Sequence, residues 1–501
     1  MNRLYLIGPI ALLLISTCSK TPDLQDTSFN ILAQIGENII TKEDFIRRAE
    51  YVIRPDYCKG TNYIHKKIIL NSLIAEKLFA LEGRQIGILE GNDKFTHFIQ
   101  GRKEQAMRQW YYYDQVFKQV KLDTSQIQSA YRLAGRTINV AYYILPTEEF
   151  SNQAIQALSD EFTFEDIYTV LDTDETIPKK EINWFDREDP IIMDQLFNSS
   201  ILKGNIIGPL TTADGSILLM KVEGWIDRSV MTETDVTQRW DDVVERLTEQ
   251  KAMKVYEKNV AELMRGKTML FNENIFKQYV AYMADHYLTK QTEKENILNQ
   301  AIWNDDTQFI TAGIGEFPFE QRKEHLVQVD SRWWDVDEFE SILQSHPLVF
   351  RKKKMNRKEF PVEFQKAVAD LFQDIELTKL CYQLQYEKLA TIRQNVALWE
   401  DHYIARDYRT KILEKTDAFK DSLSSTVETI ENVLNPVVDS LQTKYSYQIK
   451  IDTDLFESIE LTSIDMMVLQ PQMPYPVVVP TFPVFTTDSR LDYGTIIESV
   501  D

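Results

Sequence analysis

Short apolar strands and amphipathic helices follow one another near the start of the chain. Residues 33–41 (AQIGENIIT) have the pattern of two short strands around a glycine turn. Thr41 then precedes residues 42–45 (KEDF), where its hydroxyl can cap a helix whose first turn is acidic. Apolar residues at helical spacing over 64–87 predict a second helix that stops at Gly87.

The pattern changes between residues 138 and 225, where short strand-like runs replace the helical period. Such runs occupy 138–145, 206–210 and 217–222, with short helical stretches between them. This alternation predicts a compact α+β domain of about 90 residues. The charged amphipathic stretch over 232–265 predicts a long helix that follows the domain.

Residues 327–339 align without gaps on residues 33–45. Both segments have the pattern of strand, turn, strand and an acidic helix start, and an apolar helical stretch follows each, the second over 364–386. We interpret this as an internal repeat of one helical unit. Because such capped helix starts are common, two unrelated segments that look alike by chance stay open as the alternative.

The C-terminal region has a composition of its own. Residues 445–452 alternate like a strand, and five prolines follow within residues 471–483. Proline fixes φ and has no N–H donor, so these residues predict an extended, polyproline-like arm rather than a helix or a central strand. Its apolar content indicates that it lies on a groove of this chain or of a partner, with disorder as the alternative.

Together these patterns predict an α+β fold that is mainly helical, in which helical regions flank one α+β domain. We expect seven segments: a signal peptide at 1–18, a tether at 19–30, a helical region at 31–135, an α+β domain at 136–230, a linking helix at 231–268, a second helical unit at 269–425 that repeats the first, and a strand with the proline-rich arm at 426–501.

The net charge of the chain limits the classes of molecule that it is expected to bind. Its 501 residues include 77 acidic and 56 basic ones, which gives a net charge of −21. A surface this acidic repels nucleic acid and an anionic bilayer, so no nucleic-acid partner is expected. The 43% hydrophobic content is enough for several cores, which agrees with two to four domains.

The first eighteen residues have the pattern of an export signal. The apolar run over 4–15 is too short to span a bilayer, which needs about 20 residues, so it predicts the apolar part of a secretory signal. Residues 15–18 (ISTC) resemble a bacterial lipoprotein box, although Thr17 departs from the small residues preferred there. The resemblance implies that Cys18 carries the lipid and anchors the chain on the periplasmic side of the bacterial cell envelope. An ordinary cleaved signal is the alternative.

The sequence contains no motif for a metal site or for a cofactor site. Cys58 and Cys381 lie more than 300 positions apart and match no disulfide framework or metal-ligand spacing. The six histidines are dispersed, and phosphate-binding, zinc-protease and serine-hydrolase motifs are absent from the sequence. We therefore expect neither a metal nor a cofactor.

A known family shares the pattern of the N-terminal block. The turn at Ile35-Gly36 is followed by Thr41 and by the pair Asp44-Phe45. A helix with the sequence LIAEKL over 73–78 comes next.

The α+β block carries motifs of the same family. Ile144-Leu145 ends its first strand, residues 183–185 read NWF, and residues 202–210 read LKGNIIGPL. With the N-terminal block, these segments resemble the helical chaperone region and the parvulin domain of the SurA/PrsA-type (PpiC) family of peptidyl-prolyl isomerases and chaperones. The resemblance covers about 55 and 90 residues and implies a cell-envelope chaperone that binds unfolded or nascent exported proteins.

The isomerase chemistry implied by the family is in doubt. Parvulins place one histidine in the first strand and one in the last, whereas this chain has Tyr143 and Ser216 there. Prolyl rotation breaks no covalent bond, so an apolar pocket that binds the twisted amide could still act weakly. The candidate residues of such a degenerate pocket are Tyr143, Trp184, Phe185, Met193, Phe197 and Ser216.

Aromatic residues outside this block are candidates for binding unfolded peptides, because they offer a large contact area at a small entropy cost. These candidates are Trp110, Tyr111, Tyr112, Trp333 and Trp334, and core packing is the alternative for each. The sequence thus leaves three functions open: a binding chaperone, an active peptidyl-prolyl cis-trans isomerase, and a structural lipoprotein scaffold of the envelope.

Overall fold

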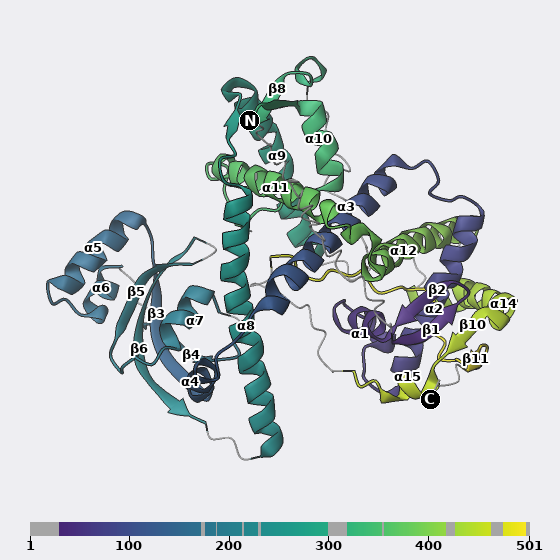
Figure 1. Ribbon diagram of the computed structural model, residues 1–501, viewed down its shortest axis with the longest axis horizontal. Coiled ribbons are helices and arrows are strands. Elements are labelled where there is room, and N and C mark those ends of the chain that lie inside the picture. Colours follow the sequence, from purple (N-terminus) through teal and green to yellow (C-terminus); the bar gives the residue numbers. More distant parts are fainter. Residues whose placement is uncertain are drawn as a thin grey trace, which may run out of the picture.

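A computed structural model places most of the chain. It describes residues 30–171, 176–186, 188–212, 215–228, 232–298, 318–352, 355–416, 426–461 and 474–496. The described part is mainly helical and contains three small, mainly antiparallel sheets, which confirms the expected α+β class at this level (Figure 1). The expected signal peptide, Cys18 and nearly all of the tether lie outside the described residues.

The first sheet joins the two ends of the described chain. Strand β1 (Ile31–Ile35) pairs antiparallel with β2 (Asn38–Thr41) on one side and with β10 (Ile449–Ile451) on the other. The short β11 (Thr495–Ile496) extends the sheet beside β10. The helices around this sheet are α1 (Lys42–Glu50), α2 (Tyr63–Gln85), α12 (Ala390–Lys415), α13 (Thr426–Thr429), α14 (Asn435–Tyr445) and α15 (Thr453–Ser458).

A second, smaller sheet has the order β7-β8-β9. It contains β7 (Met269–Phe271), β8 (His325–Val329) and β9 (Arg332–Asp335). A core of aromatic and aliphatic residues, with Phe339 and Phe364 fully buried, lies between this sheet and its helices. These helices are α9 (Glu273–Leu298), α10 (Val336–Ser345) and α11 (Phe360–Gln383).

The two hairpins share the same local design. Gly36 in the first turn has a φ of +60°, and Asp330 in the second has a φ of +56°. Thr41 and Asp335 each cap the following helix through a reciprocal capping box with the acidic residue three positions on. The same strand, left-handed turn, strand and capped helix therefore occur at both sites.

Each hairpin also receives a third strand in the same way, although the chain delivers the two strands differently. Asp452, just after β10, donates its backbone N–H to Leu32 O at 2.9 Å, and Asn272, just after β7, donates to Leu326 O at 3.0 Å. Both residues then start a helix. Strand β7 precedes its hairpin whereas β10 follows its own by some 400 positions, so the second unit is nested inside the first.

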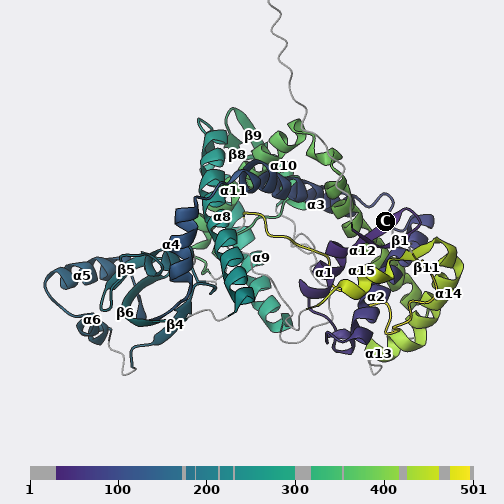
Figure 2. The ribbon, with the colours of Figure 1, turned by 60° about the horizontal axis from the view of Figure 1, so that its bottom comes forward.

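The sheet of residues 136–227 stands apart at the left of Figure 1, and Figure 2 shows the same separation from another side. Its four strands have the order β4-β3-β6-β5. One face is covered by α5 and α6, and the other by α4, α7 and α8. The strands are β3 (Arg136–Leu145), β4 (Lys179–Asn183), β5 (Ile206–Thr211) and β6 (Ile217–Asp227), and the helices are α4 (Thr124–Ala134), α5 (Glu148–Ser159), α6 (Phe164–Val170), α7 (Pro190–Leu196) and α8 (Glu233–Leu263).

Helix α3 (Asp93–Tyr111) runs between the nested units and ends in a π turn over Tyr112–Val116. At its middle, a Cβ on Gly101 would lie only 1.9 Å from Ser345 O at the end of α10. Only glycine therefore permits this close approach of α3 to the second unit.

The substitution Gly101→Ala tests this contact, because the sign of its effect on the free energy of unfolding depends on the space beside Gly101. In an open helix the change would stabilise by about 1 kcal/mol, because alanine has the higher helix propensity. Against a backbone oxygen it should instead destabilise by about 2 kcal/mol, because neither backbone can move freely. Urea unfolding measures the difference, and Lys94→Ala on the exposed start of α3 is the control, expected within about 0.5 kcal/mol. A stabilised Gly101→Ala chain would contradict the close approach.

Candidate functional site

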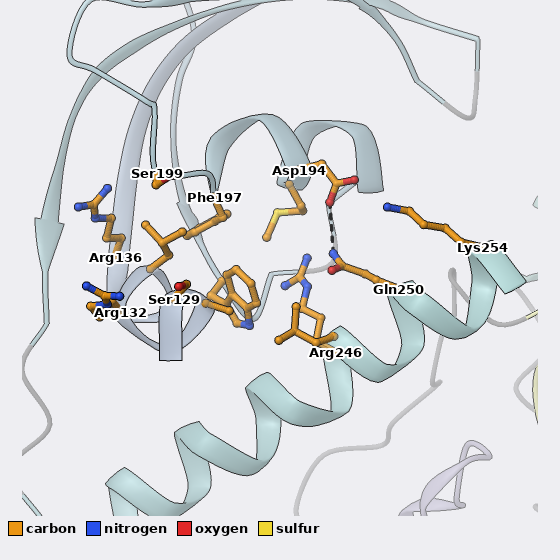
Figure 3. A pocket seen from close by; sticks show the side chains of 14 residues that line it. Ser129, Arg132, Arg136, Asp194, Phe197, Ser199, Arg246, Gln250 and Lys254 are labelled. Atoms are coloured by element: carbon orange, nitrogen blue, oxygen red, sulfur yellow. Dashed lines mark hydrogen bonds between the residues drawn. The ribbon is translucent and has the colours of Figure 1, made fainter. Parts of the chain in front are cut away.

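A pocket of about 550 Å³ opens between α4, α7 and α8 (Figure 3). Its apolar wall includes Trp184, Met193 and Phe197, which are nearly buried in the core between the sheet and these helices. The rings of Trp184 and Phe197 meet edge to face, with centroids 5.4 Å apart. An aromatic or aliphatic side chain of another molecule matches this wall in size and polarity.

Basic side chains give the pocket an excess of positive charge in an acidic protein. The Arg246 guanidinium lies 4.9 Å from the centre of the Trp184 ring, and burial lowers the pKa of Arg246 although Asp194 opposes this shift. Asp194 accepts a hydrogen bond from Gln250 at 3.2 Å. The charged residues of the lining are Arg132, Arg136, Arg246, Lys254 and Asp194. Such a lining suits a carbonyl or carboxylate beside an apolar group.

Three of the six residues expected in a degenerate prolyl pocket meet here, and three do not. Tyr143 lies on the opposite face of the sheet, where its hydroxyl donates to Phe164 O at 2.9 Å and burial raises its pKa. Ser216 is half-buried in the turn between β5 and β6, where its carbonyl accepts from Thr212. Phe185 is 50% exposed outside the pocket. Tyr143 is thus separated from the apolar wall by the sheet itself, and Ser216 does not line the pocket.

The aromatic candidates at the end of α3 are mostly core residues. Tyr111 is 8% exposed and Tyr112 is 2% exposed. The Tyr112 ring packs edge to face on Tyr256 of α8, with centroids 5.7 Å apart. Only the half-buried Trp110, which packs on Tyr113, remains partly accessible. Neither Tyr111 nor Tyr112 presents a surface to a peptide in this structure.

The two tryptophans of β9 are half-buried at the second sheet. Trp333 stacks on His325 with centroids 5.2 Å apart, and the Arg332 guanidinium lies 3.7 Å from the centre of the Trp334 ring. Trp334 also packs on Phe372 of the core. The five aromatic candidates therefore belong to two separate places in the fold.

A second candidate site, which the sequence did not locate, is the groove that holds residues 474–488. Side chains of the surrounding helices donate to the backbone carbonyls of this extended segment. Arg48 donates to Thr481 O at 2.7 Å, and Asn71 donates to Asp488 O at 2.7 Å. The other donors are Arg409 to Val484 O at 3.2 Å, Ser72 to Thr486 O at 3.4 Å, and Gln109 to Pro476 O.

Rings of the segment fill the apolar floor of the groove. Phe485 is 2% exposed and packs on Phe79 of α2, with ring centroids 4.8 Å apart. Tyr475 donates its hydroxyl to Asp374 at 2.7 Å and accepts from Tyr256 at 3.0 Å, and burial raises its pKa. These anchors hold the segment along most of its length.

A buried ion pair lies beneath the middle of the groove. Arg48 of α1 and Glu76 of α2 are both fully buried and 2.9 Å apart, and His402 of α12 lies 2.8 Å from the same carboxylate. Burial alone would raise the pKa of Glu76, but Arg48 and His402 overcome this effect and lower it from 4.5 to about 2. The pair thus links three helices to the carbonyl of Thr481.

Comparisons of the chain with protein-family models, with curated protein sequences and with solved structures found no match. Within the described ranges, no group of histidine, cysteine and carboxylate side chains is arranged to hold a metal ion. Over the same ranges, no helix combines the length and apolar composition that crossing a bilayer requires.

Phe197→Ala should destabilise the protein by about 3 kcal/mol, because it removes a nearly buried ring from the wall between α7 and the sheet. The matched control is Phe185→Ala, which removes the same ring from a half-exposed position and should change stability by less than about 0.5 kcal/mol. Urea unfolding curves give both values. Equal losses in the two variants would contradict the described packing.

The ion pair predicts a pH dependence of stability. A carboxyl whose pKa falls from 4.5 to about 2 on folding stabilises the protein above pH 4.5, and this part is lost as the pH falls from 4.5 towards 2. The stability difference between the wild-type chain and Glu76→Gln should therefore shrink by an amount on the order of 3 kcal/mol over that range. Urea unfolding at a series of pH values measures it. A difference that stays constant with pH would contradict the assignment.

Proposed function

We propose that the protein is a folding chaperone of the cell envelope, related to parvulin-type foldases and anchored through Cys18, that binds unfolded exported proteins. The observation that carries the proposal is the pocket beside α7. It combines an apolar wall of Trp184, Met193 and Phe197 with donor side chains, and it lies in the block whose motifs resemble the parvulin domain. An unfolded chain presents apolar side chains beside unpaired carbonyls, which this lining can receive together.

The surface of the same block supports binding rather than a closed core. Large apolar side chains stand exposed on it, among them Ile144, Phe162 and Leu202, with 56% or more of their surface accessible. Exposed apolar side chains of this size contribute to contacts with other proteins, and these three lie outside the lining of the pocket. A weak, general affinity for apolar segments follows from such a surface.

The pocket favours a chaperone over an enzyme. Its lining contains no histidine, and the positions aligned with the family histidines, Tyr143 and Ser216, are not part of it. An isomerase without these residues would have to act by shape alone, through desolvation of the prolyl amide and tighter binding of its twisted form. The apolar wall is the one feature that favours this second candidate function.

Two assays on residues 19–501 separate the functions. We expect strong suppression of the aggregation of an unfolded outer-membrane protein and no acceleration of cis/trans relaxation in a short prolyl peptide. Trp184→Ala should weaken suppression about tenfold, which corresponds to about 1.4 kcal/mol of lost binding, whereas Phe185→Ala should leave it unchanged.

Other outcomes would favour the alternatives. Acceleration of relaxation that Trp184→Ala abolishes would establish an isomerase and overturn the chaperone as the main function. Absence of suppression, together with one stoichiometric partner in a pull-down, would favour a structural scaffold of the envelope.

A further inference from the structure

The groove that holds residues 474–488 contacts the backbone of this segment at five carbonyls. The donors to these carbonyls are Arg48, Ser72, Asn71, Arg409 and Gln109, whereas Asp374, Tyr256 and Asn435 bond to side chains of the segment. A carbonyl occurs at every residue, so these contacts would form with many sequences. The groove therefore selects for an extended conformation.

The backbone of residues 474–488 offers acceptors that match these donors. Prolines occupy positions 474, 476, 480 and 483, and proline has a carbonyl but no N–H. A groove that offers donors therefore satisfies a proline-rich backbone without burying an unpaired amide. The polyproline conformation is also extended before binding, which reduces the entropy lost on docking.

The segment is exposed in places and buried in others. Pro476, Val478 and Thr481 are exposed, whereas Pro480, Phe482, Pro483, Phe485 and Thr486 are buried. Because the segment 474–488 forms no helix or strand of its own, its release would break no such element. Its departure would strip the buried Arg48 of one acceptor, at a cost of about 1–3 kcal/mol, so an empty groove is unfavourable.

We propose that this groove is a binding site for extended, proline-containing apolar segments of unfolded chains, and that residues 474–488 occupy it as an internal ligand. This inference rests on the proposed chaperone function and names a second client site with its regulation. An incoming segment replaces the internal one carbonyl for carbonyl and ring for ring. The internal segment keeps the donors satisfied and limits binding to clients that compete with it.

The internal segment competes strongly with a free peptide, because it is covalently attached to the groove that both would occupy. A segment attached to its own groove has an effective concentration in the millimolar range, so a free peptide of the same sequence should bind the wild-type chain only weakly. Weakening the internal segment should therefore strengthen the binding of the free peptide. This opposite response separates an internal ligand from a merely structural strap, whose weakening would create no site.

The test uses a fluorescent peptide with the sequence of residues 474–488 and the chain from residue 19 to 501. We expect Phe482→Ala to bind the peptide at least tenfold more tightly than the wild-type chain in an anisotropy titration. Adding Arg409→Ala to this variant should remove most of the gain, because Arg409 donates to Val484 O at 3.2 Å. Adding Arg406→Ala, at an arginine of the same helix that pairs with Asp407, should leave the gain unchanged.

Each outcome decides the proposal. A gain in peptide affinity that Arg409→Ala does not reduce would overturn it, as would a folded Phe482→Ala chain without any gain. Should Phe482→Ala fail to fold by circular dichroism, Val484→Ala, which shortens a half-buried side chain of the same segment, gives the same comparison. Aggregation suppression by the same variants tests the chaperone function separately, since none of these residues lines the pocket beside α7.

Discussion

The fold depends on an ion pair that is buried without access to water. Arg48 and Glu76 lose their hydration on folding, and such a pair is stable only where further hydrogen bonds occupy its remaining donors and acceptors. His402 supplies one of these bonds and the carbonyl of Thr481 supplies another. Helices α1, α2 and α12 and the C-terminal segment must therefore come together at one point, although the chain brings them from positions more than 400 residues apart.

The two repeated hairpins are nested because the C-terminal part of the chain returns to the N-terminal sheet. Strand β10 completes the sheet of the N-terminal hairpin, and α2 and α12 both pack in that unit, so the part of the chain between α2 and α12, including the separate β3–β6 sheet, β7 and the second hairpin, is an insertion into the outer unit. Helix α8 connects that sheet to β7, and α3 packs against α10 where Gly101 allows it. The pocket is thus carried on an arm whose position the long helices define.

The pocket and the groove combine the same two kinds of contact. Both present aromatic or aliphatic side chains beside arginine donors, the two kinds of contact that the proposed binding of unfolded chains would use. They differ in that the pocket is open whereas the groove is filled by residues 474–488. For the proposed binding of clients, these residues offer an apolar surface and hydrogen-bond donors to a peptide backbone.

Local features were predictable from the sequence by itself, because they depend on neighbours in the chain. The turn at Gly36, the cap at Thr41, the helix after residue 232 and the lack of helix in the proline-rich region are of this kind. Strand β7 and helix α9 went unrecognised, since a strand of three residues is stable only through its distant partner β8.

Only the tertiary structure decided which side chains share a site. Alternation places Tyr142 and Tyr143 on opposite faces of β3, but the packing of α7 on one face and α6 on the other is what puts Met193 on the far side of the sheet from Tyr143. The same holds for Tyr111 and Tyr112, which their sequence allows on a surface or in a core and which α8 buries. Burial is the sum of contacts with distant segments, so local sequence cannot determine it.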